Sequence, residues 1–147
     1  MKISDALLDD TELAARLRLA VTRLARRLRQ QTAGEVSQSQ VSALASVERL
    51  GPLTLGELAA VERVQPPSMT RIIAALEEAG LVERTVDERD RRIARVKTTV
   101  AGQRFLERSR SRKNAYLAAR VRTMSVEDRA VLARAATLLE QLLEGEE

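Results

Sequence analysis

The hydrophobic period of this chain changes from that of a helix to that of a strand over one short stretch, residues 81–98. Residues 81–86 and 93–98 are short, β-branched and partly alternating, which is the pattern of two strands. Six charged residues, 87–92, separate them, so the pattern predicts a β-hairpin with a charged tip. Apolar residues on both sides follow a helical period. The sequence therefore predicts a mainly α-helical chain with a single small β-hairpin.

The starts of the predicted helices are marked by capping pairs, in which a side-chain oxygen stands three residues ahead of a reciprocal partner. Four such pairs precede apolar-periodic runs: Asp9 with Glu12, Ser37 with Gln40, Thr54 with Glu57, and Ser125 with Asp128. Two adjacent prolines suit the first turn of a further helix, because the amides there have no partner within the helix. The helices are predicted over residues 11–32, 38–50, 55–62, 66 to the glycine at 80, 100–121 and 126–143.

The composition removes most catalytic and metal chemistry. The chain has no Cys and no His, so it lacks thiol nucleophiles, disulfides, the commonest general base and nearly every zinc, copper or haem site. Aromatic residues make up 1% of the chain, so the core is expected to be Leu, Ala and Val on helices. We expect no enzyme, no cofactor and no metal. The sequence has neither a signal-peptide pattern nor a long apolar run, which predicts a cytoplasmic protein without membrane association.

Positive charge is concentrated in two blocks. The net charge is +4, but residues 16–34 hold six Arg and no acid, and residues 99–122 hold seven bases and one acid. Together with a sequence pI of about 10.3, these blocks favour a polyanionic partner, nucleic acid first and an anionic membrane surface second. The alternative is that these arginines are ordinary solvated residues on helix faces.

The order of elements predicts a winged helix–turn–helix lobe over about residues 37–98. It is embedded in a single domain, 1–147, between outer helices over about 5–34 and 100–147. The outer helices carry apolar stripes that the small lobe cannot cover, so a second copy of the chain is expected to bury them. The residues expected at this dimer interface are Leu13, Leu17, Leu24, Leu132, Leu138, Leu139 and Leu142.

Four segments within residues 54–102 carry a family resemblance: Leu55–Ala59, Ser68–Arg84, Asp87–Arg92 and Val96–Gly102. Together they resemble the MarR family of bacterial transcription regulators, and the flanking helices have the expected lengths and order. The resemblance implies a homodimeric, effector-responsive regulator, here expected to be a repressor, whose lobes straddle a pseudo-palindromic operator in double-stranded DNA. Some relatives sense peroxide through a Cys or bind zinc through His. This chain has neither residue, so it can do neither by those routes. A cleft between dimer helices and lobe is the implied site for a small-molecule effector, and its lining is not assigned.

The helix that begins at the two prolines is the expected recognition helix, with its N-terminal end in the major groove. Arg71 can bond bidentately to guanine and Gln65 can pair with adenine. The prolines can touch a thymine methyl or simply start the helix, and Arg71 can instead pair with a neighbouring acid. The residues expected to face outward are Gln65, Pro66, Pro67, Ser68, Thr70 and Arg71.

The charged hairpin is the expected wing, short enough to place an arginine in a narrow minor groove. The resemblance implies that Asp87 or Asp90 orients Arg89 or Arg92 for this insertion, because a carboxylate can hold a guanidinium in fixed geometry. A mobile, solvated charge loop is the alternative. The wing residues expected to serve DNA binding are Arg84, Asp87, Arg89, Asp90, Arg91 and Arg92.

Three other functions fit the sequence less well. A winged-helix module for protein contact should present apolar anchors, whereas this recognition helix presents Ser68, Thr70 and Arg71. An architectural DNA-binding protein would share the charge pattern but lack sequence preference. An enzyme would need a phosphate loop, nucleophile elbow or paired carboxylates, and none of these motifs is present in the sequence.

Overall fold

The computed structural model describes residues 8–32, 34 and 36–144. Residues 5–7 and 33 of the first expected outer segment, and 145–147 of the second, therefore lie outside the described chain. The chain divides into two compact units, residues 1–113 and 114–147. None of the helices in the described ranges combines the length and hydrophobicity that crossing a bilayer requires. The elements in chain order are α1 (Asp10–Gln30), α2 (Gln38–Leu50), α3 (Leu55–Glu62), α4 (Pro66–Glu78), β1 (Val82–Val86), β2 (Ala94–Thr98), α5 (Val100–Val121) and α6 (Val126–Leu143).

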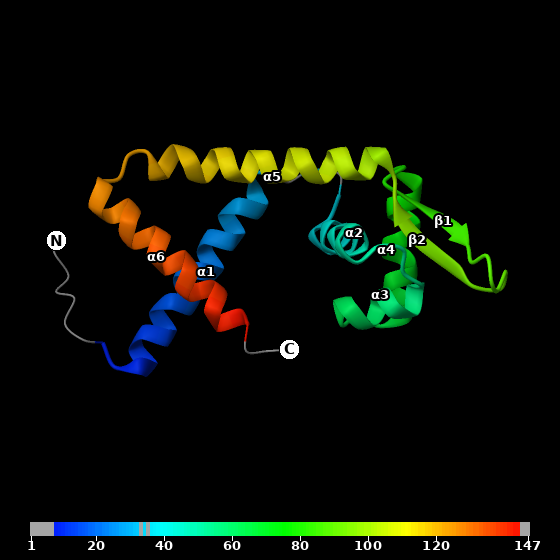
Figure 1. Ribbon diagram of the computed structural model, residues 1–147, viewed down its shortest axis with the longest axis horizontal. Helices are drawn as coiled ribbons and strands as arrows, with labels where there is room; N and C mark the ends of the chain where they lie inside the picture. The colour runs from blue at the N-terminus through cyan, green and yellow to red at the C-terminus, as the bar shows by residue number, and fades with distance from the viewer. Residues whose placement is uncertain (1–7, 33, 35, 145–147) are drawn as a thin grey trace. The chain divides into compact units, whose positions relative to one another are not determined.

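This order confirms the mainly α-helical winged helix–turn–helix fold. Figure 1 shows α2, α3 and α4 gathered beside the β1–β2 hairpin. The strands pair antiparallel with Val82 opposite Thr98 and Val86 opposite Ala94. Each strand is one residue shorter than predicted at its first position. Leu81 donates its amide to the carbonyl of Leu76 in the turn that ends α4, and Ile93 donates to Asp90 within the tip.

The four capping residues lie where the sequence predicts, but only two of the four pairs form a complete capping box. Ser37 and Thr54 form complete capping boxes with Gln40 and Glu57. Asp9 and Ser125 accept the amides of Glu12 and Asp128, but in the described chain neither partner returns a hydrogen bond. The shorter side chain of Asp128 explains the missing bond at α6, because it reaches less far back than Glu or Gln. α1 ends at Gln30, two residues before the predicted end.

The core of the lobe lies between α2, α3, α4 and the hairpin. The link before α3 adds a third short segment to the sheet, since Leu53 and Val96 exchange two backbone hydrogen bonds of 3.1 and 2.7 Å. A single bridging residue has no alternating pattern, so the sequence does not indicate it. The largest fully buried side chains are Leu44, Val47, Leu58, Met69, Ile73, Leu76 and Val96.

The start of α5 is locked against the turn between α4 and β1. The hydroxyl of Thr99 donates to the carbonyl of Gly80 at 2.6 Å and accepts the amide of Gly102 at 3.1 Å. A Cβ added at Gly102 would lie 2.1 Å from the carbonyl oxygen of Leu81. The Thr-x-x-Gly spacing therefore serves a close backbone approach that another residue cannot make.

The outer helices differ sharply from the lobe in burial. Neither α1 nor α6, both wholly within the described residues, contains a buried residue. Leu13 on α1 is 51% exposed and Leu142 on α6 is 65% exposed. Apolar surface of this extent on two helices is unusual for a monomeric soluble protein.

Candidate nucleic-acid interface

The turn between α3 and α4 sets the direction in which α4 leaves the lobe. Arg63 takes the left-handed conformation, with φ 54° and ψ 43°, and ends α3. Gln65 then caps α4 without a side-chain hydrogen bond, and Pro66 and Pro67 occupy its first turn, as predicted. The six residues expected to face outward at this end are all exposed, whereas Met69 between them is fully buried.

Thr70 and Arg71, two of these outward residues, differ in whether their side chains already have a bonding partner. Thr70 donates its hydroxyl to the carbonyl of Pro66 at 3.0 Å. A phosphate oxygen can only accept, so Thr70 can contact one only by giving up this bond. Arg71 makes no ion pair in the described part of the chain. Its guanidinium keeps all five donors available for a partner.

A partly buried polar contact that the sequence does not indicate holds α2 against the end of α3. Glu62 accepts hydrogen bonds from the hydroxyls of Ser42, at 2.6 Å, and of Ser46. Ser46 is 7% exposed, so its bond lies at the edge of the core. The partners are 20 and 16 residues apart in the chain, and no local motif reports such a pairing.

The tip of the hairpin is folded around the carboxylate of Asp87. One of its oxygens accepts the backbone amides of Arg89, at 2.8 Å, and Asp90, at 3.3 Å. The other accepts the guanidinium of Arg95 at 3.1 Å. The Arg89 amide and the Arg95 guanidinium lower the pKa of Asp87, so the carboxylate stays charged at neutral pH. The tip is thus a hydrogen-bonded turn.

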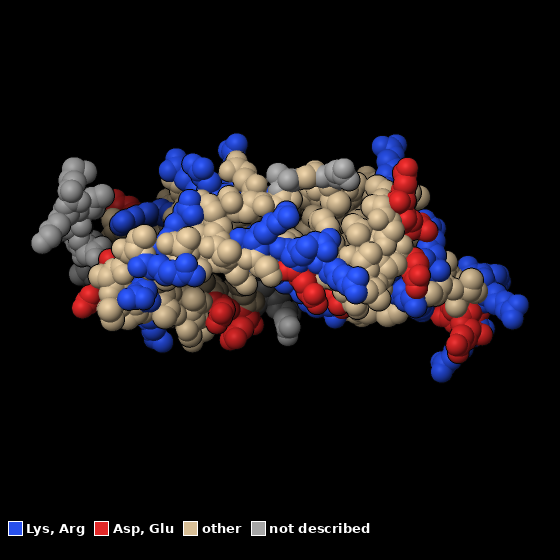
Figure 2. Space-filling view, turned by 90° about the horizontal axis from the view of Figure 1, so that it is seen from above, with Lys and Arg blue, Asp and Glu red and all other residues tan. Residues whose placement is uncertain are grey.

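Asp90 holds the guanidinium of Arg92 in bidentate geometry, which is one of the pairings that the family resemblance implies. Nε and one terminal nitrogen of Arg92 each lie 3.1 Å from a different oxygen of Asp90. Hydrogen bonding to Arg92 lowers the pKa of Asp90, and the same bond raises the pKa of Arg92. The side chain of Arg92 is nevertheless 90% exposed, so it projects while its orientation is fixed. Figure 2 shows charges of both signs gathered where this tip lies, at the right-hand end.

The remaining wing residues are divided between tip and strand. Arg89 and Arg91 are exposed at the tip. Arg84 lies in the middle of β1, where its Nε is 2.7 Å from a carboxylate oxygen of Glu77 on α4, so the structure does not bring it to the tip. Arg95 on β2 is not among the residues predicted from the sequence, although it contacts both Asp87 and Glu57. An arginine within a strand pattern gives no sign of which acids it will meet.

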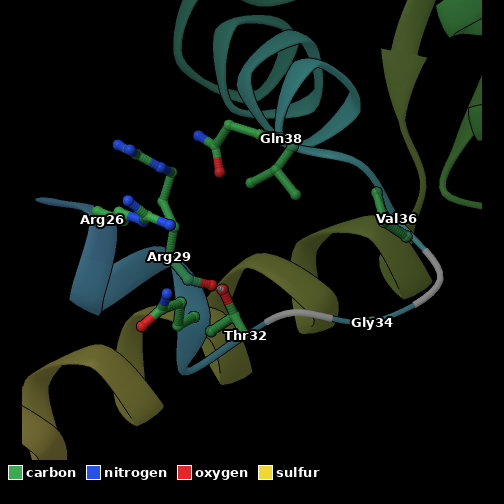
Figure 3. A pocket seen from close by; sticks show the side chains of 8 residues that line it. Arg26, Arg29, Thr32, Gly34, Val36 and Gln38 are labelled. Carbon is green, nitrogen blue, oxygen red and sulfur yellow. Dashed lines mark hydrogen bonds between the residues drawn. The ribbon is translucent and has the colours of Figure 1, made fainter.

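A hollow of about 430 Å³ lies between the end of α1 and the start of α2. Figure 3 shows the side chains of Arg26 and Arg29, from α1, and Gln38, from α2, around the same space. Val36 and Val41 add apolar surface to it. The hollow thus offers guanidinium donors beside an apolar wall, a combination suited to a small organic anion.

Comparison with known proteins places these elements in a family context. The MarR family model matches residues 36–94. An HTH-type transcriptional regulator of Mycobacterium leprae is 40% identical over 136 residues, covering 92% of this chain and 95% of the relative. A MarR family protein of Bacillus stearothermophilus has a similar solved structure, with a TM-score of 0.76, 27% identity, and coverage of 91% of this chain and 94% of that one. The structure of Streptococcus pneumoniae FabT in complex with DNA is similar in fold, with a TM-score of 0.68, 20% identity, and coverage of 95% and 100%.

Proposed function

The chain belongs to the MarR family of transcription regulators, and we propose that it acts as a homodimer that binds a pseudo-palindromic operator in double-stranded DNA and represses transcription there. In this proposal α4 reads base edges in the major groove and the hairpin tip enters the adjacent minor groove. The alternative within DNA binding is an architectural protein that binds without sequence preference.

The observation that carries the proposal is the Asp90–Arg92 pair at the hairpin tip. An arginine that projects into solvent normally samples many rotamers, and ordering it on binding costs free energy. The two hydrogen bonds that the Arg92 guanidinium donates to Asp90 fix its orientation before any ligand arrives. A pre-oriented guanidinium suits a narrow minor groove, where negative potential is concentrated.

The exposed start of α4 supports major-groove contact. Arg71 has the donors for a bidentate contact with guanine, and Gln65 leaves its amide unused in the capping of α4. FabT, whose fold is similar, has been crystallised with DNA. The homodimer is supported by the exposed apolar residues of α1 and α6, because a DNA-binding dimer needs an interface outside its two lobes.

The hollow beside Arg26 and Arg29 is the proposed effector site. Its guanidinium groups and apolar wall suit a small aromatic or lipophilic anion, which would bind beside the lobe. Such a ligand would release DNA if it bound the DNA-free conformation more tightly.

A binding selection on random duplex DNA tests this function. A regulator should enrich one pseudo-palindromic sequence, and the selection repeated with organic anions would reveal an effector. Arg71→Ala should weaken binding to the selected sequence by about 1–3 kcal/mol and relax the preference at one base pair of each half-site. Arg71→Lys is the matched control, because it keeps the charge and loses the bidentate geometry.

The selection also separates the alternatives. Enrichment of no sequence would identify an architectural binder. An equal loss for Arg71→Ala on selected and random DNA would make Arg71 a phosphate contact and would contradict its assignment as a base reader.

A further inference from the structure

We propose that Arg95 is a positioning residue for DNA recognition: it joins the hairpin tip to α3 through Asp87 and Glu57, and thereby fixes where the wing arginines lie relative to α4. This inference rests on the proposed function, because its consequence is a preference for the base pairs that flank each half-site. We call the three residues Glu57, Arg95 and Asp87 the wing brace.

The brace is a continuous path of hydrogen bonds. Nε of Arg95 lies 3.1 Å from one oxygen of Asp87, and a terminal nitrogen of Arg95 lies 3.3 Å from an oxygen of Glu57. The second oxygen of Asp87 holds the amides of Arg89 and Asp90 in the tip. One guanidinium therefore connects α3 to the turn that carries the wing arginines.

The inner end of the brace is anchored in a rigid part of the lobe. The Glu57 oxygen that meets Arg95 also accepts the amide of Thr54 at 2.9 Å, in the capping box of α3. α3 packs against α4, and the fully buried Leu58 of α3 and Met69 of α4 belong to the same core. The brace thereby fixes the position of the tip relative to the recognition helix, α4.

The hairpin needs such an anchor because a two-stranded sheet has little stiffness of its own. From Val96 toward the tip the hairpin projects from the core: Val86, at the end of β1, and Ile93, just before β2, are exposed. Through its contacts with Asp87 and Glu57, Arg95 links this outer half of the hairpin to α3. The Arg95 side chain is one-third exposed. Without the brace, the tip keeps its charge but loses a fixed position over the groove.

The test uses charge-matched variants on the same hairpin. Arg95→Gln removes the guanidinium and breaks the brace. Glu57→Gln weakens it, because a neutral amide oxygen replaces the carboxylate at Arg95 and can still accept the Thr54 amide. Lys97→Gln and Glu83→Gln are the controls, because Lys97 and Glu83 form an exposed ion pair across the hairpin, 3.0 Å apart, outside the brace. Each brace variant thus has a control with the same change in charge.

Charge alone predicts that Arg95→Gln and Lys97→Gln weaken binding on all DNA, and that Glu57→Gln and Glu83→Gln strengthen it. The brace predicts that Arg95→Gln and Glu57→Gln, despite their opposite charge changes, both reduce the preference for the selected flanking base pairs by about two- to fivefold, the range expected for a partly exposed ion pair. The preference within the major-groove half-site should stay unchanged. Both controls should keep the flank preference of the natural protein.

A second measurement needs no DNA. In the free protein, NMR water exchange of the Arg89 and Asp90 amides should be about two- to fivefold faster in both brace variants than in both controls. Faster exchange with no change in flank preference would reduce the brace to a purely structural role and overturn the proposal. Unchanged exchange and unchanged preference would also overturn it.

The failure of the proposed function would look different. A natural protein that enriches no DNA sequence would refute the proposed function, while the exchange rates would still report whether the brace exists. A decrease of about 0.9 per chain in the salt slope for Arg95→Gln, together with tighter binding by Glu57→Gln, would make Arg95 a phosphate contact and overturn its positioning role.

Discussion

At the scale of single residues, Gly102 shows how one position can join two parts of the chain. The helix interior normally favours Ala over Gly by about 0.5–1 kcal/mol. At Gly102 the added Cβ would stand 2.1 Å from the Leu81 carbonyl oxygen and 2.7 Å from Cγ2 of Thr98. A carbonyl of the main chain cannot move aside without shifting the turn that carries it, so steric cost exceeds helix propensity here.

We therefore predict that Gly102→Ala lowers the free energy of unfolding by about 1–3 kcal/mol, the usual cost of overpacking. Gly56→Ala is the control, since Gly56 also lies in a helix but its added Cβ would meet nothing closer than 4.0 Å. That variant should be more stable by about 0.5–1 kcal/mol. Urea denaturation measures both changes. Stabilisation by Gly102→Ala would show that α5 can leave the Leu81 turn at little cost.

The residues that the sequence locates correctly are those with local partners. Ser37, Thr54 and the paired prolines act within three or four residues of the chain, and their patterns predict both position and role. Glu62, Arg84 and Arg95 act on residues that are brought near by folding. A sequence shows that such a side chain is charged, but only packing determines which opposite charge it meets.

At the scale of elements, the boundaries of α2, α3, α5 and α6 agree with those predicted. Three of these helices, α2, α3 and α6, begin at a capping residue that the sequence marks. The strands and α1 are shorter than the pattern predicts. Residues at these ends satisfy their backbone groups in turns, as Leu81 does with Leu76. Hydrophobic pattern alone does not distinguish a strand residue from an apolar residue in the adjoining turn.

The hairpin tip allows a test in which geometry and charge predict opposite results. Asp90→Ala removes an acid near the proposed DNA, so electrostatics alone predicts tighter binding. It also releases the Arg92 guanidinium from its two hydrogen bonds. We predict weaker binding to the selected sequence, most clearly with A·T-rich flanks, where the minor groove is narrow.

Titrations of labelled duplexes with and without A·T-rich flanks measure this effect. Glu88→Ala is the control, because Glu88 is an exposed acid in the same tip and its loss changes the charge equally. Tighter binding by Asp90→Ala would mean that Asp90 is simply a repulsive charge, and its orienting role would then be abandoned.

At the scale of the whole molecule, the distribution of apolar surface distinguishes the lobe from the outer helices. The lobe buries its large side chains within one chain, from Leu44 to Val96. α1 and α6 leave theirs exposed, although both have the apolar stripes and capped starts of stable helices. Local sequence thus determines that these helices form, whereas it does not determine which surface covers them.

We predict that this surface is a second copy of the chain, and that light scattering at micromolar concentration gives twice the chain mass of 16.3 kDa. Leu138→Asp tests the interface, because Leu138 is 45% exposed on α6 and a charge there costs little in a single chain. Buried and unpaired in a dimer, the same carboxylate would cost about 3–5 kcal/mol, enough to lower dimer affinity by about two to three orders of magnitude or more.

The matched variant is Ala136→Asp, on the same helix and about 200° around its axis from Leu138. Ala136 is exposed, so this variant should remain a dimer. Leu138→Asp should give the monomer mass with an unchanged helical circular dichroism spectrum, because no residue of α6 belongs to the buried core of the lobe. A monomer mass for the natural protein, or equal dimerisation by the two variants, would contradict an interface at Leu138. The apolar face of α6 would then need a different partner.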